Sequence, residues 1–521
     1  MTLSHLLQMQ TLTHGMDIVI LSVTSPHEEL FWKKRLDCMR GQVIKEHTLI
    51  LTVCEDWEGG AGNALGTLYA FSKANQKMQE MFKCSLFDRL DQGDSIALYH
   101  TAGKGTRLAP LTACEYNSKS RIKLVGQLFD KTAPVPITLL EAILKQTSIF
   151  APKRKGRLSV FWGDQLFIPT NEIQEVHHEV DLLVKLLPKI PDSNTWAQEN
   201  YHKYGLVILN EQNSFKQLEK LNYESFKELN ISTTEKVGLS LGSFSLSKRM
   251  LEELLHEFDS ELTHQKGKMD TDPHLWMPLS LDFKTYLNIF KKKNLPEAVI
   301  QFHYERMQIF KAKFLEKTKN PLLGASDLGG ETLWWDYGNR ASYHQNILKI
   351  TEKTEEGEAM RTFFSIPKDS ENHVEEAGLK IENSTLINCS IRKGSIKNSV
   401  LINVFAEEVN LENSVLIQAS AQKVDAKGAI LYNIAENGPL IMEDAKVRAD
   451  NFSKKYGHVK LYNSIHSPTP WDQCAKENPF SFAKLYQLNQ GLHPSEGQLR
   501  AQTAHNQVKQ AVINLQIQEK E

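Results

Sequence analysis

The stretch Ile96-Ala-Leu-Tyr-His-Thr-Ala-Gly-Lys-Gly-Thr-Arg-Leu-Ala-Pro-Leu-Thr112 joins a short apolar run to a loop that contains two glycines. The run from Ile96 to His100 is typical of a buried strand. Gly103 and Gly105 follow it directly, and glycines at a strand end let backbone N–H groups approach a phosphate chain closely. Arg107 adds a planar cation that can bind two phosphate oxygens at once. The stretch therefore predicts a phosphate-binding loop at the end of a β-strand.

Similar apolar runs alternate with helical patterns through the first two thirds of the chain. We expect strands at residues 17–23, 47–53, 96–100 and 158–162, and helices at residues 67–82 and 137–149. This alternation predicts an α/β fold with a mostly parallel sheet. In such sheets, ligands bind beyond the carboxyl ends of the strands, where the glycine loop would lie.

A heptapeptide recurs at even spacing in the last third of the chain. Its copies are Ile381-Glu-Asn-Ser-Thr-Leu-Ile387, Ile396-Lys-Asn-Ser-Val-Leu-Ile402 and Leu411-Glu-Asn-Ser-Val-Leu-Ile417, with Ala426-Lys-Gly-Ala-Ile-Leu-Tyr432 as a degenerate fourth. One copy cannot bury its own apolar face, so the copies are expected to stack, with Asn-Ser as a turn and Leu-Ile as a short strand. The pattern predicts a β-helix, and a chance echo within a β-sandwich is the alternative. The leucines at equivalent positions would be Leu386, Leu401, Leu416 and Leu431.

The composition is that of an ordinary globular protein. The 521 residues are 41% hydrophobic and 24% charged with a net charge of −2, which favours neither nucleic acid nor an anionic membrane as a partner. No apolar run is long enough to cross a bilayer, and the segment from Met1 to Asp17 lacks the basic and apolar regions of a signal peptide. The cysteines form no CxxC pair and are expected to be reduced thiols of a cytoplasmic protein. They are Cys38, Cys54, Cys84, Cys114, Cys389 and Cys474.

The glycine loop resembles the signature of the sugar-1-phosphate nucleotidyltransferases, which reads Gly-x-Gly-Thr-Arg-Leu followed by Pro-Leu-Thr and is matched from Gly103 to Thr112. The resemblance implies a Rossmann-like (GT-A-like) domain with a mixed sheet. It also implies an enzyme that joins a nucleoside triphosphate, UTP or GTP, to a sugar 1-phosphate and releases pyrophosphate. The nucleotide-binding residues that it implies in this loop are Ala102, Gly103, Gly105 and Thr106.

Two cations are implied to be catalytic by the same resemblance. Arg107 stands at the arginine of the signature and would stabilise the departing pyrophosphate. Lys123 stands where the family has a phosphate-binding lysine, although the proline that usually precedes it is Ile122 here. Lys123 would contact the sugar phosphate or the α-phosphate.

Further segments match the family in chain order. Val160-Phe-Trp-Gly-Asp-Gln-Leu-Phe167 resembles a strand that ends in Gly-Asp, and Leu333-Trp-Trp-Asp-Tyr-Gly-Asn339 resembles a later Trp-x-Asp motif. The resemblance implies that Asp164 and Asp336 hold a Mg²⁺ ion, and that Asp164 is catalytic. Taken singly, Asp164 could be a turn residue and Lys220 a surface charge. The residues implied for the sugar are Tyr204, Gly205, Glu219, Lys220 and Gly242.

The chemistry accounts for these residue types. An oxygen of the sugar phosphate attacks the α-phosphorus of the triphosphate, and pyrophosphate leaves. Because charge develops on phosphoryl oxygens, catalysis rests on positioning and electrostatic stabilisation, and no protein nucleophile is needed. Two carboxylates can hold the magnesium ion that draws both anionic substrates together.

A long segment precedes the signature, and it contains a second glycine loop, Glu58-Gly-Gly-Ala-Gly-Asn-Ala-Leu-Gly-Thr-Leu68. We interpret it as a second nucleotide-contacting loop through Gly62, Gly66 and Thr67. The alternative is a loop that only opens a helix, with Asn63 as its cap. This order, with an early strand and His100-Thr-Ala-Gly103, resembles the fucose-1-phosphate guanylyltransferase and fucokinase group.

These patterns divide the chain into residues 1–350 as a catalytic domain, 370–445 as a β-helix and 446–521 as an extension that ends in a helix. The terminal helix is expected from Gln498 to Glu521, with Val508, Val512 and Leu515 on one face. A homo-oligomer through the β-helix is expected. Two other functions stay open. One is an acyltransferase site on the repeats, which contain no histidine between His373 and His458. The other is a regulatory protein that binds nucleotide sugars without turnover.

Overall fold

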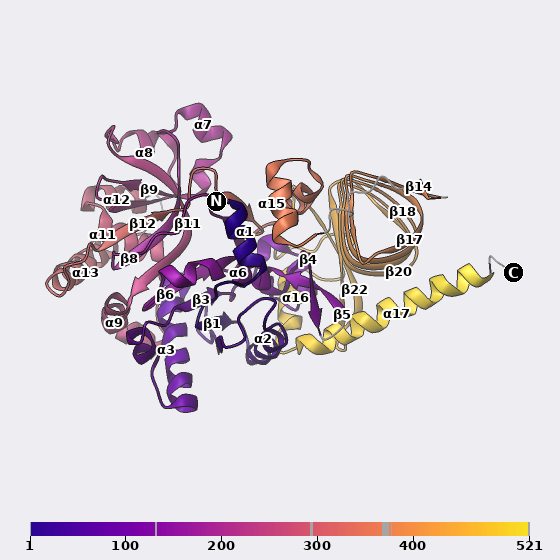
Figure 1. Cartoon of the computed structure of the whole chain (residues 1–521), viewed down its shortest axis with the longest axis horizontal. Helices are drawn as coiled ribbons and strands as arrows, with labels where there is room; N and C mark the ends of the chain where they lie inside the picture. Colours follow the sequence, from indigo (N-terminus) through magenta and orange to yellow (C-terminus); the bar gives the residue numbers. More distant parts are fainter. Residues whose placement is uncertain (1, 131–132, 292–294, 367–374, 377, 519–521) are drawn as a thin grey trace.

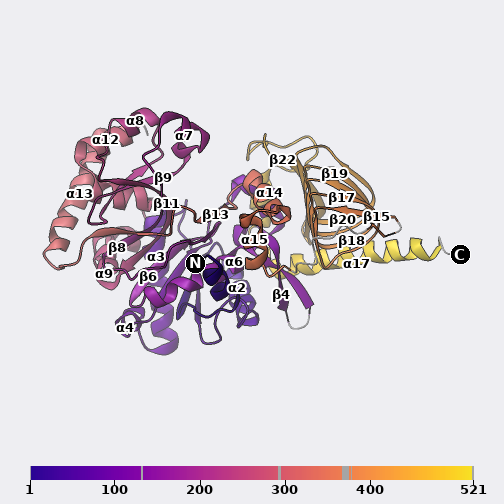
Figure 2. The same cartoon turned by 45° about the horizontal axis from the view of Figure 1, so that its top comes forward.

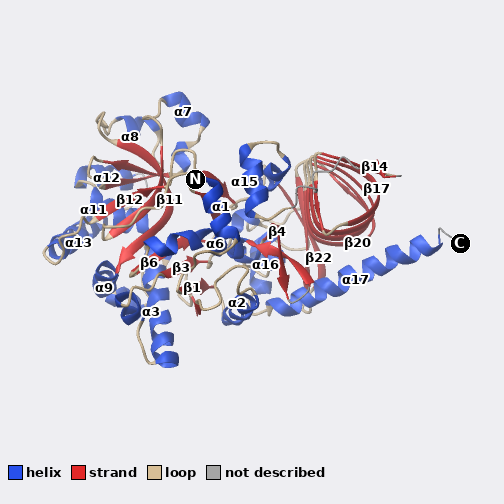
Figure 3. Ribbon diagram, viewed as in Figure 1, coloured by secondary structure: helices blue, strands red, loops and turns tan. Residues whose placement is uncertain are grey.

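The computed structural model describes the whole chain except residues 1, 131–132, 292–294, 367–374, 377 and 519–521. Two sheet-containing bodies lie beside each other (Figures 1 and 2), an α/β body built from residues before the gap at 367–374 and a second body that begins after it. Helices surround the sheet of the first body, whereas the second body is almost entirely strand until its last helices (Figure 3). The chain therefore has an α/β part and a second large sheet at its C-terminal end.

One half of the first sheet is parallel and carries the four predicted strands. These are β1 (Ile18–Val23), β2 (Leu49–Cys54), β3 (Ile96–His100) and β6 (Arg157–Trp162), in the order β6-β3-β1-β2. All the pairings between them are parallel. The strands are apolar along nearly their whole length because both of their faces are buried.

Alternate side chains of these strands enter two cores. Val19 and Leu21 pack with α2 (Pro26–Cys38) and α6 (Leu139–Thr147) on one face of the sheet. Ile18 and Ile20 pack with α3 (Gly62–Phe82) and α9 (Lys248–Glu257) on the other face. The predicted helices at 67–82 and 137–149 correspond to α3 and α6 and are confirmed, with a 3-10 helix (Ser148–Lys153) continuing α6.

The other half of the sheet departs from the prediction of a mostly parallel arrangement. The long strand β11 (Lys236–Ser247) pairs antiparallel with β6, with β8 (Val180–Leu186) and with β9 (Gly205–Leu209). β9 and β10 (Phe215–Glu219) form a hairpin, and β12 (Leu323–Asp327) pairs parallel with β8. Short connections such as residues 210–214 permit antiparallel neighbours, and the apolar pattern of a strand does not report its direction. The sheet is therefore mixed.

The other elements of this body cover the sheet or extend from it. They are α1 (Thr2–Gln10), α4 (Leu86–Asp91), α5 (Leu111–Cys114), β4 (Lys123–Asp130), β5 (Ala133–Thr138), β7 (Gln165–Ile168), α7 (Ser193–Gln198), α8 (Tyr223–Lys227), α10 (Asp259–His264), α11 (Met277–Ser280), α12 (Phe283–Lys291), α13 (Glu297–Leu315), β13 (Leu333–Asp336), α14 (Arg340–Leu348) and α15 (Glu355–Phe363). α15 lies beyond residue 350, yet it belongs to this body, because Gln10 of α1 donates a hydrogen bond to the carbonyl of Thr362.

The second sheet is built from the repeats. Its strands β16 and β17 both pair in parallel with β18, and β18, β19 and β20 pair in parallel in turn, so that Leu386, Leu401, Leu416 and Leu431 stand in register. This confirms the predicted equivalence of the four leucines. The strands are β14 (Glu375–Glu376), β15 (Leu379–Glu382), β16 (Thr385–Ile387), β17 (Ser390–Lys397), β18 (Val400–Glu412), β19 (Val415–Lys427), β20 (Ile430–Met442), β21 (Lys446–Ser453) and β22 (Gly457–Ser464).

The Asn-Ser pairs form the turns between these strands, as predicted. Asn398 and Asn413 adopt left-handed backbone conformations with φ of 46° and 49°, which asparagine tolerates better than most residues. The serine that follows each asparagine is buried, and its hydroxyl accepts a hydrogen bond from the next copy. Ser399 N lies 3.0 Å from Ser384 Oγ, and Ser414 N lies 3.1 Å from Ser399 Oγ. Each copy thus satisfies a buried donor of its neighbour.

The sheet continues across residue 445, because β21 pairs in parallel with β20 and β22 returns antiparallel. Two helices follow, α16 (Phe482–Asn489) and α17 (Pro494–Gln518). α17 runs along the second sheet (Figure 1) and buries Val508 and Val512 against it, which confirms a terminal helix with an apolar face. The side chain of Leu515 and residues 519–521 lie outside the described part of the structure.

Two expectations from the sequence concern membrane-spanning helices and the state of the cysteines. None of the helices within the described residues is long and apolar enough to span a membrane. All six cysteines are free thiols.

Candidate active site

The two predicted metal-binding aspartates lie together at the carboxyl edge of the parallel strands. Asp164 occupies the turn between β6 and β7, and Asp336 is the last residue of β13. β7 and β13 pair antiparallel with Gln165 opposite Asp336, and the Tyr337 N–H donates to the Asp164 carbonyl at 2.9 Å. This pairing brings two segments that are far apart in the sequence to one place.

Gly338 marks the centre of the cluster. A Cβ atom placed on this glycine would lie 2.9 Å from Asp336 Oδ1, 3.2 Å from Asp164 Oδ2 and 3.4 Å from Arg107 Nη2. Any side chain here would therefore crowd both carboxylates and the guanidinium. The Gly338 N–H donates to Asp336 Oδ1 at 2.6 Å, which orients the carboxylate. The structure thus brings the predicted residues Arg107, Asp164 and Asp336 together.

The electrostatics of the pair suit a bound cation. Burial raises the pKa of the Asp336 carboxyl, and the negative charge of Asp164 raises it further, against the opposing effects of Arg107 and Lys119. Among the described residues there is no group of three or more acidic, histidine or cysteine side chains placed for a metal. Two carboxylates nevertheless fit Mg²⁺, which usually keeps waters and binds substrate phosphates as its other ligands.

The lysine in this cluster is Lys119, which was not predicted from the sequence. Lys119 Nζ lies 3.0 Å from Asp164 Oδ2, and both side chains are mostly buried. Lys123, the lysine implied by the family signature, instead forms an ion pair with Glu115, and its ammonium lies 5.0 Å from the centre of the Tyr432 ring. The sequence contained a signal for Lys119. The proline that precedes the family's lysine is Ile122 here, so the match at Lys123 was inexact, and Lys119 is another lysine in the same basic stretch after the signature.

The glycine loop has one open position and one packed position. Gly103 has φ of 140° with no other atom within 4 Å of a Cβ placed there, so a ligand can approach its backbone. Gly105 has φ of 56° and packs against Thr112, and Thr106 begins a 3-10 helix (Thr106–Leu108). The Ala102 N–H already donates to the Ser22 carbonyl at 3.0 Å. The structure therefore gives Ala102 an internal partner and leaves Gly103 accessible.

The second glycine loop opens α3, and its amide groups have partners within the protein. The Asn63 N–H donates to Asp270 Oδ1 at 3.0 Å, and the Ala64 N–H donates to the Met269 carbonyl at 2.9 Å. A Cβ on Gly62 would lie 2.3 Å from that carbonyl oxygen. Asn63 is not the cap, since the N-cap of α3 is Ala61. These contacts favour the alternative in which this loop opens a helix and packs against residues 269–270.

Gly66 and Thr67 of α3 face the end of β3. The Thr67 hydroxyl lies 2.7 Å from His100 Nε2, and a Cβ on Gly66 would lie 3.6 Å from the His100 ring and 3.7 Å from Glu55 Oε2. Burial lowers the pKa of His100 to about 4, and the charge of Lys119 acts in the same direction. His100 is therefore neutral at physiological pH. His100 therefore contacts Thr67 of the predicted loop on one side and lies within the electrostatic influence of Lys119, which pairs with Asp164.

Gly242 lies against Trp162, another residue that was not predicted from the sequence. A Cβ on Gly242 would lie 2.1 Å from Trp162 Nε1, and the Trp162 ring stacks on His100 with 5.7 Å between ring centres. Gly242 has φ of 72° and lies where the pairing of β11 with β8 is irregular. Glycine is required here by both the backbone and the indole.

Apart from Gly242 on β11, the residues predicted for the sugar lie on β9, on β10 and in the segments that flank them. Gly205 pairs with Glu219 across the hairpin, and Lys220 Nζ lies 2.9 Å from Glu219 Oε1. The Tyr204 ring lies 5.1 Å from the ring of Trp334, which is two residues before Asp336 in β13. Tyr204 thereby joins this group to the aspartate pair.

An additional acid stands beside these residues. Burial raises the pKa of Asp272 to about 8, with a further contribution from the charge of Glu219. Asp272 begins a short π-helix (Asp272–Trp276), a local distortion that occurs often at functional sites. A carboxyl group that holds a proton near neutral pH can donate a hydrogen bond to a sugar hydroxyl.

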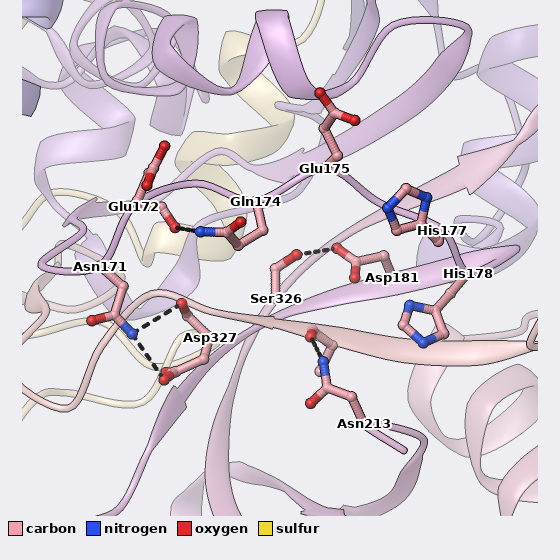
Figure 4. Close-up of a pocket in the computed structure, with 11 residues that line it drawn as sticks. Asn171, Glu172, Gln174, Glu175, His177, His178, Asp181, Asn213, Ser326 and Asp327 are labelled. Carbon is pink, nitrogen blue, oxygen red and sulfur yellow. Dashed lines mark hydrogen bonds between the residues drawn. The ribbon is translucent and has the colours of Figure 1, made fainter. Parts of the chain in front are cut away.

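A hollow of about 460 Å³ lies elsewhere in the α/β body (Figure 4). Its wall includes Asp181 and Asp327 near the paired strands β8 and β12, and none of the predicted site residues. Asp181 already binds Ser326 and Arg154, at 2.8 and 2.9 Å, and Asp327 accepts from Asn171 at 3.0 Å. Both aspartates of this hollow therefore have partners within the protein.

The chain was compared with known proteins. No family model matches it, and no match is found among curated proteins.

Proposed function

We propose that this chain is a nucleotidyltransferase that forms a nucleotide sugar and pyrophosphate from a nucleoside triphosphate and a sugar 1-phosphate. The observation that carries the proposal is the convergence of Arg107, Asp164 and Asp336 on Gly338. Two carboxylates and a guanidinium at the carboxyl edge of a parallel sheet suit a reaction between two phosphate groups. UTP and GTP are the donors that we propose to test first.

The cations of the site have distinct roles in this proposal. The exposed Arg107 presents a guanidinium that can bind two oxygens of the β- and γ-phosphates and stabilise them as pyrophosphate leaves. Lys119 exchanges its bond with Asp164 for the α-phosphate or the sugar phosphate, where negative charge increases during the attack. Gly103 leaves its backbone open to the phosphate chain.

The carboxylates organise the site for a cation. Asp164 and Asp336 would hold Mg²⁺, which supplies Lewis-acid stabilisation of the phosphoryl oxygens when it is bound. The carboxylates do not act as nucleophiles here. Their role is to balance the cation and to fix its distance from Arg107 and Lys119, and the Gly338 N–H keeps Asp336 oriented for that purpose.

The sugar is proposed to lie between Tyr204 and the hairpin of β9 and β10. Glu219 and the backbone near Gly205 supply hydrogen-bond acceptors, and a protonated Asp272 supplies a donor. Lys220 is 65% exposed and can reach the sugar phosphate. A sugar bound there would lie next to Trp334 and therefore near the aspartate pair.

The proposal extends to the finer architecture, a Rossmann-like (GT-A-like) domain followed by a β-helix. The parallel order β6-β3-β1-β2 and the antiparallel β11 support the first assignment. The parallel, in-register pairing of successive copies from β17 to β20 supports the second. Assembly of copies through the repeats stays a prediction.

A matrix of nucleoside triphosphates and sugar 1-phosphates, read by pyrophosphate release with Mg²⁺ present, tests this function. We expect release only when both substrates are present, with one preferred pair. Binding of a nucleotide sugar without release for any pair would instead support the regulatory, non-catalytic alternative.

A further inference from the structure

The fourth copy of the repeat departs from the pattern of the others, and one of its changes lies in the column of the isoleucines. Ile387, Ile402 and Ile417 stand in register with one another, and the next copy has Tyr432 in their place. The Tyr432 side chain is fully buried, so its hydroxyl must have partners. The aliphatic residue of the earlier copies would fill the same column without a hydroxyl, so the packing of the coil does not call for tyrosine here.

The partners of Tyr432 lie in the α/β body, directly after the glycine loop. The Tyr432 hydroxyl donates to Glu115 Oε1 at 2.6 Å and accepts from the Lys123 N–H at 3.0 Å. The Lys123 ammonium forms an ion pair with the same Glu115. One phenol thus joins both ends of the segment from Glu115 to Lys123, and Lys119 lies in the middle of that segment.

Residues from the second body also form hydrogen bonds with the turn that precedes Glu115. The Ala113 carbonyl accepts from Asn451 Nδ2 at 2.7 Å and from Asn489 Nδ2 at 2.9 Å. The Ala109 carbonyl, two residues after Arg107, accepts from Arg340 Nη1 at 2.7 Å and from Asn463 Nδ2 at 3.0 Å.

Arg340 follows Asp336 closely in the chain, and its Nε donates to the Ser464 carbonyl at 3.1 Å. The glycine loop, the Asp336 segment and the second sheet therefore meet at one buried guanidinium.

We propose that the second sheet is part of the catalytic unit, and that Tyr432 is a positioning residue for the reaction. Tyr432 acts through Glu115 and Lys123, which fix the backbone that directs Lys119 toward Asp164. Lys123 therefore has a role although it does not contact the aspartate pair. The same role explains why the repeat has tyrosine in place of isoleucine in the copy that contacts the segment from Glu115 to Lys123. The inference rests on the proposed function, because the group that it positions is assigned there.

Tyr432→Phe in the full-length chain tests the inference, because it removes one hydroxyl and keeps the ring. We expect kcat per folded molecule to fall about tenfold, as for one lost hydrogen bond to a charged group, with little change in the KM of the sugar phosphate. Amide hydrogen exchange should accelerate in residues 109–123. Tyr462→Phe is the matched control, since Tyr462 is on β22 and its ring packs against Arg448. It should leave both readouts unchanged.

Two further variants distinguish a loss of positioning from a loss of folding. Tyr432→Ile restores the residue of the earlier copies, so the sheet should fold while kcat still falls. Tyr432→Phe combined with Glu115→Gln should lose no more than the larger single change, because both act through the same bond. If Tyr432→Phe lowers only the melting temperature and leaves kcat and exchange of residues 109–123 unchanged, the residue is structural and the inference is wrong. Absence of pyrophosphate release by the unaltered chain for every substrate pair would overturn the proposed function and this inference together.

Discussion

Lys119 and Lys123 are close in the sequence, but their ammonium groups meet different carboxylates. Lys119 binds Asp164, whereas Lys123 binds Glu115. The family signature assigns the phosphate-binding role to the position of Lys123. We propose Lys119 for this role instead, because of the two lysines it is the one that contacts the aspartate pair.

Replacing each lysine by methionine separates the two assignments. Lys119→Met should lower turnover by about a hundredfold or more, since it removes a charge that faces the developing phosphoryl charge. Lys123→Met should lower it less and should also lower the melting temperature, because Glu115 would keep its charge in a buried site without its ion pair. Steady-state kinetics and thermal melting of both variants decide the question. The opposite order of activity losses would restore Lys123 to the catalytic role.

The half-buried position of Asp336 has a consequence for stability that is separate from activity. Its pKa is raised above the ordinary 3.8, so the folded protein binds this proton more tightly than the unfolded chain does. As the pH rises through the interval above 3.8, ionising the carboxyl therefore costs folding stability, and the cost persists at neutral pH without metal.

Asp336→Asn should consequently cut turnover by about a hundredfold or more while the metal-free protein melts at the same or a higher temperature at pH 7. The difference in melting temperature should vanish as the pH falls below 3.8. Added Mg²⁺ should stabilise the unaltered chain and not the variant. The exposed Asp472→Asn serves as the control and should change neither property. Wild-type turnover in Asp336→Asn, with magnesium still required, contradicts the metal assignment.

Arg107 offers a third test at this scale, because its guanidinium is exposed in the free protein. Arg107→Lys keeps the charge and loses the fork that binds two oxygens, so it should fold and lose much of the rate. Arg107→Ala should be slower still, with weaker triphosphate binding and an unchanged melting temperature in the absence of ligand. Calorimetric titration with the triphosphate and thermal melting provide the two readouts. A destabilised Arg107→Ala with full turnover per folded molecule would make the residue structural.

At the scale of elements, the stacking of the copies predicts that shortening one buried side chain strongly lowers the stability of the second sheet. Leu416 is fully buried and lies between Leu401 and Leu431 in its column. Leu416→Ala should destabilise the second sheet by about 2–5 kcal/mol, read as lost hydrogen-exchange protection in β18 to β20. Ile441→Ala on the same sheet removes a side chain that is 79% exposed and should cost less than about 0.5 kcal/mol. Equal effects of the two changes would contradict this packing.

Elements with a strong local pattern could be predicted from the sequence. β1, β2, β3 and β6 are apolar runs that are buried on both faces, and the Asn-Ser turns repeat with their strands. The antiparallel direction of β11 could not be predicted, since apolar alternation is the same in both directions. Asp164 and Asp336 were found through their motifs. Lys119 and Tyr432 were not, because their partners are set by tertiary contacts with segments that are distant in the sequence.

At the scale of the whole molecule, the two bodies share one buried hydrogen-bond network. The turn after the glycine loop is bonded to the second sheet through Ala109 and Ala113, and Arg340 links that sheet to the segment of Asp336. Hydrogen bonds in such a buried setting are electrostatically stronger than in water. The C-terminal third therefore supports the candidate site as well as its own fold.

The reaction proposed for the cluster around Gly338 is the attack of a sugar phosphate oxygen on the α-phosphorus of a triphosphate. A triphosphate labelled at its α-phosphorus, incubated with the preferred sugar 1-phosphate and Mg²⁺, follows that bond directly. We expect the label to enter the nucleotide sugar and pyrophosphate to be released unlabelled. Release of inorganic phosphate with no labelled nucleotide sugar would contradict the proposed reaction, as would transfer of the label to the sugar phosphate in a parallel incubation with a γ-labelled triphosphate.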